Sequence, residues 1–330
     1  MSECIHWSDF NLNSVKAPIK QVIYINIESD CSNDFVRLPL MIVKGKDDGP
    51  TLTVLGGVHG DEYEGPFAVR ELFKQLDTAS LNGTFIGLPQ SNPPATEGGT
   101  RKSPIDNLNL ARVFPGNQDG SITEKIAHFI SKQLIDKSSF LIDLHSSGTQ
   151  ISTPTLVGYD ASEKGVNNGS KDSALSFGVD VIWGHKTLSD GRSISYANSI
   201  NIPWLYTECS GGGWLHIKEA DLYTKGVLNV MVNLKMIGGE RRKIQPKFQL
   251  LGDGDMDESI TASVSGYLVP KVNILSRVTK GQLLGEILGP ANELLEKIKS
   301  PTNGVIVLIR RSAAVIKDES ITFLVTGESP

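Results

Sequence analysis

The chain has few cysteines, and no apolar run is long enough to cross a membrane. Its three cysteines, Cys4, Cys31 and Cys209, lie far apart and none forms a Cys-x-x-Cys pair. This pattern argues against a disulfide framework and against a cysteine-based metal motif. The apolar stretches fall short of the roughly 18 residues that suggest a transmembrane helix, and the first residues lack the basic and apolar regions of a secretion signal. We therefore expect a cytoplasmic protein with reduced thiols and no membrane partner.

An excess of basic residues is also absent. Lys and Arg number 32 against 37 Asp and Glu, for a formal net charge of -5, so no nucleic-acid partner is expected. A hydrophobic fraction of 39% and a charged fraction of 21% are ordinary for a globular protein. The length of 330 residues predicts one or two domains. These features point to a small-molecule substrate, and they are compatible with a homo-oligomer.

Strand and helix patterns alternate over residues 1–246. Apolar segments typical of strands occur at residues 21–27, 35–43, 51–57, 84–88, 139–144 and 204–207. Helical periodicity follows residue 62 to about residue 76, begins again at a Ser-x-x-Glu capping box at residue 121, and runs from residue 216 to about 237. This alternation predicts an α/β domain with a mixed, mostly parallel sheet flanked by helices.

The pattern changes over residues 247–330, which contain only short strands separated by glycines and prolines. Such spacing predicts a small C-terminal β-sandwich or barrel. The segment resembles the barrel-sandwich fold of biotinyl and lipoyl carriers, whose modified lysine lies at a hairpin tip. Here the corresponding turn, residues 288–291, contains no lysine. A structural or substrate-shaping role is therefore favoured over a carrier role.

Two histidines and a glutamate follow predicted strands. His59 and Glu62 come directly after the strand at 51–57, and His145 ends the strand at 139–144. Imidazole and carboxylate groups are good zinc ligands, and three of them leave an open fourth position, as in catalytic zinc sites. Asp143, on the same face of its strand, is placed to orient the His145 imidazole. The alternative is an acidic helix start with an incidental histidine.

A third strand-end group is Glu208, which precedes a run of three glycines at 211–213. Its carboxylate is suited to act as a general base, taking a proton from an attacking water molecule and returning it to the leaving nitrogen. The alternative is an ordinary glutamate before a flexible loop. The strand-end position, shared with His59 and His145, favours the catalytic interpretation.

Two arginines lie in a long irregular segment between a strand and the helix at 121. Long loops inside compact domains are frequently functional. One of the guanidinium groups of Arg101 and Arg112 is suited to polarise a scissile carbonyl, and the other to hold a substrate carboxylate. Taken singly, each arginine is more typical of a surface ion pair than of a catalytic or binding site.

Together these motifs resemble the succinylglutamate desuccinylase/aspartoacylase family, a branch of the zinc carboxypeptidase superfamily. The matching positions, in the family's order, are residues 59–62, 100–101, 108–112, 114–116, 143–145 and 208. The resemblance extends over about residues 35–240, and the C-terminal segment is similar to that of bacterial members. It implies a zinc-carboxypeptidase-like catalytic domain at 1–246 and a β barrel-sandwich at 247–330.

The resemblance also implies roles for individual residues. One zinc ion per chain would be held by His59, Glu62 and His145, and Glu208 would act as the general base. Arg101 would polarise the carbonyl, and the substrate carboxylate would be recognised by Arg112.

One position departs from the family pattern. The family usually has asparagine directly before the second arginine, where this chain has Ala111. An amide that could bind the substrate is therefore missing. Asn109 lies two positions earlier and faces the same way if the segment is extended, so we assign it to substrate binding with Arg112. The change leaves the zinc chemistry intact and opens the identity of the substrate.

The sequence therefore predicts a zinc-dependent hydrolase that cleaves the amide bond of a small N-acylated amino acid or related molecule. A metallocarboxypeptidase or an esterase with the same chemistry is the alternative. A non-catalytic binding protein is disfavoured, because a protein that had lost catalysis would be expected to have lost at least one of the ligands, the base or Arg101.

Overall fold

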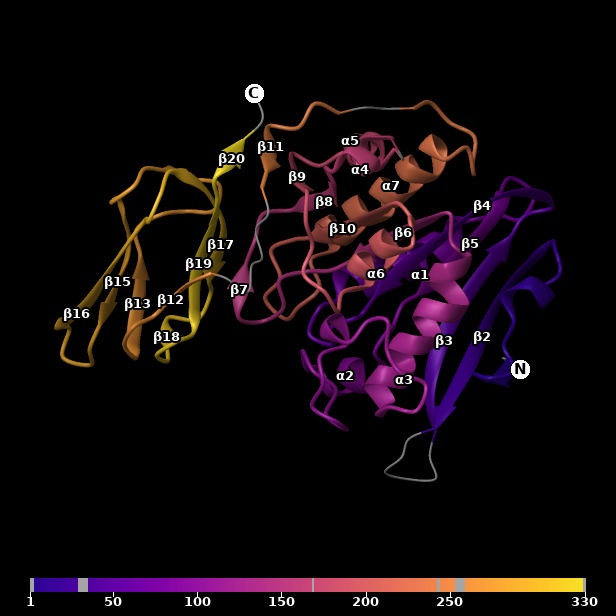
Figure 1. Cartoon of the computed structure of the whole chain (residues 1–330), viewed down its shortest axis with the longest axis horizontal. Coiled ribbons are helices and arrows are strands. Elements are labelled where there is room, and N and C mark those ends of the chain that lie inside the picture. The colour runs from indigo at the N-terminus through magenta and orange to yellow at the C-terminus, as the bar shows by residue number, and fades with distance from the viewer. Residues whose placement is uncertain (1–2, 29–34, 168, 242–243, 253–258, 329–330) are drawn as a thin grey trace.

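The computed structural model describes residues 3–28, 35–167, 169–241, 244–252 and 259–328. Its described part is a mixed α/β structure built on an 11-stranded sheet, in the order β1-β2-β3-β5-β4-β6-β10-β8-β9-β11-β20 (Figure 1). The strands of this sheet are β1 (Glu3–His6), β2 (Ile19–Glu28), β3 (Phe35–Lys44), β4 (Asp47–Gly56), β5 (Asn82–Leu88), β6 (Phe140–Leu144), β8 (Leu156–Asp160), β9 (Val181–His185), β10 (Trp204–Glu208), β11 (Phe248–Leu251) and β20 (Gly327–Glu328).

The centre of this sheet is parallel. Strands β5, β4, β6 and β10 pair side by side in the same direction, and the direction reverses where β10 meets β8. Parallel neighbours must be joined by crossover connections, which helices usually provide. The carboxyl ends of β4, β6 and β10 therefore meet at one edge of the sheet. The predicted α/β class is confirmed.

Helices cover both faces of the sheet. Because side chains alternate along a strand, Phe140 and Ile142 of β6 pack on one face, and Leu141 packs on the other. The first face is covered by α1, α5 and α7, and the second by α3 and α6. The helices are α1 (Glu64–Gln75), α2 (Pro93–Gly98), α3 (Ile122–Phe129), α4 (Glu163–Asn167), α5 (Ser170–Phe177), α6 (Ser193–Ser199) and α7 (Ile217–Asn233). Within the described ranges, none of these helices is both long and apolar enough to cross a membrane.

The C-terminal ends of two helices are irregular, and one of them differs from the sequence prediction. The predicted capping box is present, with Ser121 N donating to Glu124 Oε2 at 2.9 Å, but α3 gives way to a π-helical turn at Ile130–Leu134. Helix α7 ends at Asn233 instead of near residue 237. Beyond it Lys235 adopts a positive φ of 61°, a left-handed conformation that cannot continue a right-handed helix.

The C-terminal strands form two smaller antiparallel sheets with an apolar cluster of their own, which includes Leu268, Ile287 and Ile306. One sheet has the order β12-β19-β17-β14 with β7 beside β17, and the other has the order β16-β15-β13-β18. These strands are β7 (Ile151–Ser152), β12 (Ile260–Thr261), β13 (Gly266–Pro270), β14 (Arg277–Val278), β15 (Leu283–Leu288), β16 (Leu294–Lys299), β17 (Gly304–Arg310), β18 (Ala314–Val315) and β19 (Ser320–Val325).

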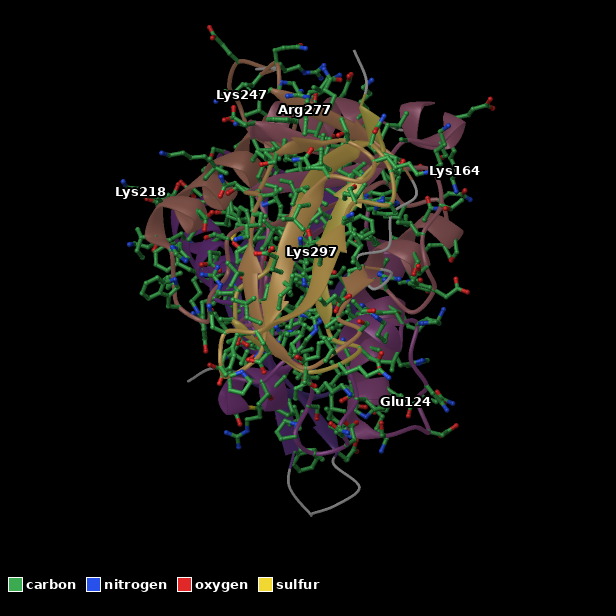
Figure 2. All side chains as sticks on the ribbon, turned by 90° about the vertical axis from the view of Figure 1, so that its left-hand side faces the viewer. Glu124, Lys164, Lys218, Lys247, Arg277 and Lys297 are labelled. Carbon is green, nitrogen blue, oxygen red and sulfur yellow. The ribbon has the colours of Figure 1, made fainter. Side chains whose placement is uncertain are left out.

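Two strand exchanges attach these sheets to the larger one. Strand β7 leaves the larger part of the chain to pair with β17. In the other direction, β20 pairs with β11, which itself continues the large sheet beside β9. In Figure 2, which views the molecule from the side of the C-terminal strands, they lie in front of the larger part, with Lys297 of β16 labelled near their centre. Backbone hydrogen bonds therefore fix the position of the C-terminal strands.

The close approach of β8 and β10 gives a stability test. Gly158 of β8 faces Tyr206 of β10, and a Cβ at Gly158 would lie 1.8 Å from Tyr206 Cε1. Gly158→Ala should therefore lower the free energy of unfolding by about 1–3 kcal/mol, as overpacking does. Urea denaturation measures this change. The control is Gly238→Ala, where an added Cβ meets no described atom within 4 Å. Equal stability of the two variants would contradict the Tyr206 placement.

Candidate metal centre and active site

Three neighbouring parallel strands deliver side chains to one edge of the sheet. His59 follows β4, His145 follows β6 directly, and Glu208 is the last residue of β10. Gly60 N donates to Thr100 O at 2.8 Å, which brings the segment carrying Arg101 against this turn. Ligands in α/β sheets bind beyond the carboxyl ends of the strands, so this edge is the expected position of a site.

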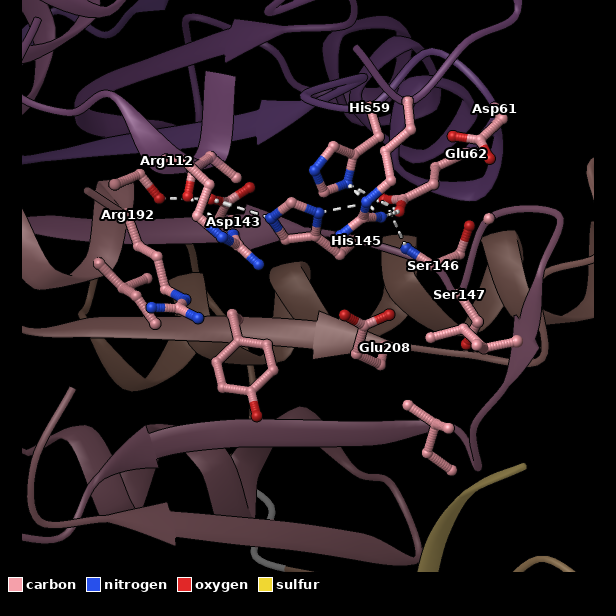
Figure 3. Close-up of a pocket in the computed structure, with 18 of the residues that line it drawn as sticks. His59, Asp61, Glu62, Arg112, Asp143, His145, Ser146, Ser147, Arg192 and Glu208 are labelled. Atoms are coloured by element: carbon pink, nitrogen blue, oxygen red, sulfur yellow. Dashed lines mark hydrogen bonds and ion pairs between the residues drawn. The ribbon is translucent and has the colours of Figure 1, made fainter. Parts of the chain in front are cut away.

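Glu62 connects the two histidines. Its Oε1 lies 2.8 Å from His59 Nδ1, and its Oε2 lies 3.1 Å from His145 Nδ1 (Figure 3). Ligand atoms of the three residues lie within 4.8 Å of one another. Both His59 and Glu62 are 3% exposed, so solvent does not compete for these atoms. The structure thus brings together the three residues that the sequence predicts as ligands, with a donor set that suits zinc.

The far side of each imidazole faces an oxygen acceptor. His59 Nε2 lies 3.1 Å from Asn109 Oδ1, and His145 Nε2 lies 3.3 Å from Asp143 Oδ2. When Nε2–H donates to these acceptors, Nδ1 keeps its lone pair and faces the Glu62 carboxylate. Such outer partners fix the tautomer of a metal-binding histidine. Ser193 Oγ of α6 donates to Asp143 in turn.

The buried charges perturb one another. Burial raises the pKa of Glu62, but the neighbouring His59 and His145 outweigh burial and hold that pKa well below its usual range. Burial lowers the pKa of His145, but the Asp143 and Glu62 carboxylates outweigh it and raise that pKa well above the usual value. Burial, aided by Arg101, lowers the pKa of His59. The group therefore holds one clearly ionised carboxylate between two unlike imidazoles.

Glu208 faces this group from β10, as Figure 3 shows. Burial, together with the Glu62 carboxylate, raises the pKa of Glu208 to about 8. Without a cation at the His–Glu–His group, this carboxyl is therefore mainly protonated at neutral pH. A bound divalent cation favours the ionised form of a neighbouring carboxyl, which would make Glu208 a proton acceptor.

The two predicted arginines occupy different parts of the cleft. Arg101 Nη1 lies 3.5 Å from Glu62 Oε1 and 3.3 Å from His59 Nδ1, directly beside the His–Glu–His group. Arg112 Nη1 donates to the Ala111 carbonyl at 2.9 Å. Arg112 lies on the opposite side of His145 from Glu62 (Figure 3). One guanidinium therefore lies against Glu62 and His59, and the other lies on the far side of His145 (Figure 3).

A third arginine was not predicted from the sequence. Arg192 lies beside Arg112 in Figure 3, because Phe114 N donates to Gly191 O at 3.0 Å. This contact requires glycine: Gly191 has a φ of 83°, and a Cβ there would lie 2.4 Å from Arg112 O. The sequence signal was a glycine followed by an arginine just before a helix, which is too common to single out.

These residues line a cleft of about 710 Å³, a size typical of small-molecule sites. His185 and Tyr206 contribute a hydrogen-bonded pair to its wall, with His185 Nε2 2.9 Å from Tyr206 OH. Leu308 and Ser320 of the C-terminal strands complete the wall. Of the described residues at positions 109–112, those that line the cleft are Ala111 and Arg112; Asn109 lies behind His59, with Oδ1 also accepting from Ala111 N at 3.0 Å.

Sequence comparison identifies relatives of the chain. The sequence model of a protein family, the succinylglutamate desuccinylase/aspartoacylase catalytic domain, matches residues 48–234. The chain is 28% identical over 293 residues to the N-alpha-acetyl-L-2,4-diaminobutyric acid deacetylase of Halomonas elongata, a match that covers 88% of this chain and 85% of that protein.

Solved structures share the fold. A succinylglutamate desuccinylase from Silicibacter sp. TM1040 superposes with a TM-score of 0.84 at 24% identity, over 93% of this chain and 94% of that one. An aspartoacylase family protein from Mesorhizobium loti superposes with a TM-score of 0.77 at 26% identity, over 98% of each chain. The match therefore includes the C-terminal strands.

The contact between Asn109 and His59 can be tested. Asn109→Ala removes the acceptor for His59 Nε2–H and should weaken zinc binding about 10–100-fold, the usual effect of losing an outer partner. Competition with a chelator of known affinity measures this change. The control is Asn117→Ala. It removes a loop hydrogen bond from Asp119 N that involves neither His59 nor His145. Unchanged zinc affinity in Asn109→Ala would show that Asn109 does not orient His59.

Proposed function

The chain belongs to the succinylglutamate desuccinylase/aspartoacylase family, and from that premise we propose that it is a zinc-dependent hydrolase of the amide bond in a small N-acylated amino acid or related molecule. The observation that carries the proposal is the convergence of His59, Glu62 and His145 with Glu208 at one cleft. A binding protein would not need the partly buried Glu208 carboxyl to face the three candidate ligands.

The donor set fits one zinc ion per chain. His59, Glu62 and His145 would hold the ion, and the outer contacts to Asn109 and Asp143 would favour the ring tautomers that leave Nδ1 free to bind it. When bound, zinc would act as a Lewis acid on the carbonyl and lower the pKa of water.

Glu208 would carry the proton. Its carboxylate accepts a proton from the water molecule as the water oxygen bonds to the carbonyl carbon. The same carboxyl then donates that proton to the nitrogen as the carbon–nitrogen bond breaks, releasing an acid and an amine. Burial favours the protonated form of Glu208, and a bound cation would favour the ionised form. These opposed effects suit a carboxyl that accepts a proton in one step and returns it in the next.

The two predicted arginines would have different roles, Arg101 in catalysis and Arg112 in substrate binding. Arg101, beside the metal ligands, would stabilise the charge that develops on the carbonyl oxygen. Arg112, on the far side of His145, would hold the substrate carboxylate, with Arg192 next to it in the same part of the cleft. Asn109 would contribute to this recognition through the main chain, since it accepts from Ala111 N and so fixes the turn that carries Arg112.

The substrate class follows from the relative and from the cleft wall. The Halomonas elongata relative is a deacetylase of an N-acetylated diamino acid, and two arginines at one end of the cleft suit a carboxylate of that kind of molecule.

We propose that residues 1–246 form the catalytic domain and 247–330 a β barrel-sandwich that closes the cleft wall through Leu308 and Ser320. This wall favours small molecules over long peptides, which places a carboxypeptidase second. The enzyme would act in the cytoplasm.

Replacing Glu208 tests the function directly. Glu208→Gln keeps the shape of the side chain and removes the proton acceptor, so it should retain zinc and lose about 10²–10⁴-fold in kcat. A hydrolysis screen over N-acyl amino acids identifies the substrate, and zinc analysis follows occupancy. Glu71→Gln, on the outer part of α1, is the control. Activity near that of the control would eliminate Glu208 as the base, and absence of hydrolysis by the zinc-loaded wild type would refute the enzyme assignment.

Arg112 and Arg101 should affect different kinetic constants. Arg112→Met should mainly raise KM, because a carboxylate contact exists before and during the reaction. Arg101→Met should mainly lower kcat, because its contact strengthens as the oxyanion forms.

Ala111→Asn would add a donor beside Arg112, worth about 1.5–3 kcal/mol in good geometry, and should improve binding of simple N-acyl amino acids. The kinetic constants of all three variants are measured on a substrate and on its carboxamide analogue. An equal effect of Arg112→Met on KM for the two molecules would refute carboxylate recognition by Arg112.

A further inference from the structure

A second group of ligand atoms lies on the other face of the sheet from Glu208. A carboxylate oxygen of Glu64, a carboxylate oxygen of Glu219 and the Sγ atom of Cys209 lie within 4.8 Å of one another. Successive side chains of a strand point to opposite faces of the sheet, so this group lies on the face opposite the cleft. Tyr206 and Glu208 line the cleft, whereas Cys209 packs in the apolar cluster on the side of α1 and α7.

Each member comes from a different element. Glu64 is the first residue of α1, Glu219 lies in the first turn of α7, and Cys209 directly follows β10. None of the three is among the residues of the proposed catalytic site. The group therefore joins two helices to the segment that carries Glu208.

The two carboxyl groups of this cluster have no cationic side-chain partner within the described part of the chain. Glu64 is fully buried at 0% exposed; its Oε1 accepts from His216 N at 2.9 Å, and its Oε2 has no partner. Among the described residues, neither Glu64 nor Glu219 pairs with a lysine, arginine or histidine side chain. A buried carboxylate is strongly unfavourable unless a cation, a proton or hydrogen bonds compensate it.

Neighbouring donors hold Glu219 in place. Its Oε1 accepts from Thr155 Oγ1 at 2.8 Å and from Ser210 N at 3.3 Å, and its Oε2 accepts from Ser210 Oγ at 2.5 Å. These three donors leave one acceptor position free, on Oε2, since a carboxylate has about four acceptor positions, two on each oxygen. The orientation of Glu219 toward Cys209 is thus fixed before any ligand binds.

The thiol adds selectivity. Burial, together with the Glu64 and Glu219 carboxylates, holds the pKa of Cys209 far above its usual range, so the free thiol is protonated and would release its proton to solvent on binding a cation. A thiolate with two carboxylates is a poor set for magnesium or calcium, which prefer oxygen alone. It suits zinc, which accepts both sulfur and oxygen ligands.

We propose that Glu64, Cys209 and Glu219 form a second divalent-cation site, which takes zinc and is separate from the His59–Glu62–His145 group. The ion would tie α1 and α7 to the segment after β10. Since Cys209 adjoins Glu208, occupancy of the site would hold the main chain of Glu208 in place. The three glycines that follow, at 211–213, all have positive φ values, so this segment depends on outside contacts for its conformation.

Cobalt substitution tests the site, because the two groups differ in sulfur. The His59–Glu62–His145 group contains no thiol, so a sulfur-to-cobalt charge-transfer band in the near ultraviolet reports only on a cysteine ligand. The full chain, produced with cobalt in the medium, should bind two equivalents and show this band. Cys209→Ser should lose the band and one equivalent. Cys4→Ser/Cys31→Ser, which keeps Cys209 as its sole thiol, should retain both.

Two further variants separate this proposal from the proposed function. His145→Ala should lose the other equivalent and keep the band. Glu219→Gln, whose amide keeps the shape of the side chain, should weaken binding of the thiol-linked ion at least about 10–100-fold while thermal unfolding shows a folded chain. A wild-type protein that binds a single equivalent without the band, lost in His145→Ala, would overturn the second site and leave the catalytic proposal standing. A band that persists in Cys209→Ser would also overturn it.

Discussion

The parallel pairing of β4, β6 and β10 is the constraint on which the site depends. Because the three strands run side by side in one direction, their ends bring His59, His145 and Glu208 to one edge although these residues are far apart in sequence. The reversal at β8 ends this arrangement and places Gly158 opposite Tyr206. A shift of one residue in β10 would exchange the faces of Glu208 and Cys209. The register of one strand thus decides which side chain meets the cleft and which meets the helices.

Electrostatics then makes this edge dependent on a cation. Glu62 is ionised between two histidines, while desolvation and the nearby Glu62 carboxylate raise the pKa of the partly buried Glu208. In the described structure the Arg101 guanidinium lies beside the group, and it is half-exposed. A buried divalent charge would relieve the repulsion between the two carboxylates and release Glu208 to act as a base. The proposed zinc ion would therefore stabilise the folded site as well as take part in the reaction.

Strand-end placement made the main residues of the site predictable. His59, His145 and Glu208 each follow an apolar segment, and a parallel sheet must bring such positions together. The alternation of segments likewise predicted the α/β class. Arg192 could not be found in this way, because its position depends on a contact between Gly191 and the Arg112 segment that no local pattern encodes. The return of β20 to the large sheet was equally hidden, since two residues carry no periodicity.

The side chains around position 111 show why the two ends of the cleft can change independently. Asn109 Oδ1 accepts from both His59 Nε2 and Ala111 N, so it supports the metal-binding end whatever side chain follows two positions later. Ala111 lines the cleft with Arg112, where a missing amide would alter recognition without removing the contact to His59. Hydrogen-bonding groups set specificity by what they leave unpaired when the wrong molecule binds. Without the amide at position 111, the substrate no longer has to supply a hydrogen-bond partner there, and recognition is left to the guanidinium groups. A family can in this way keep its zinc chemistry and change its substrate.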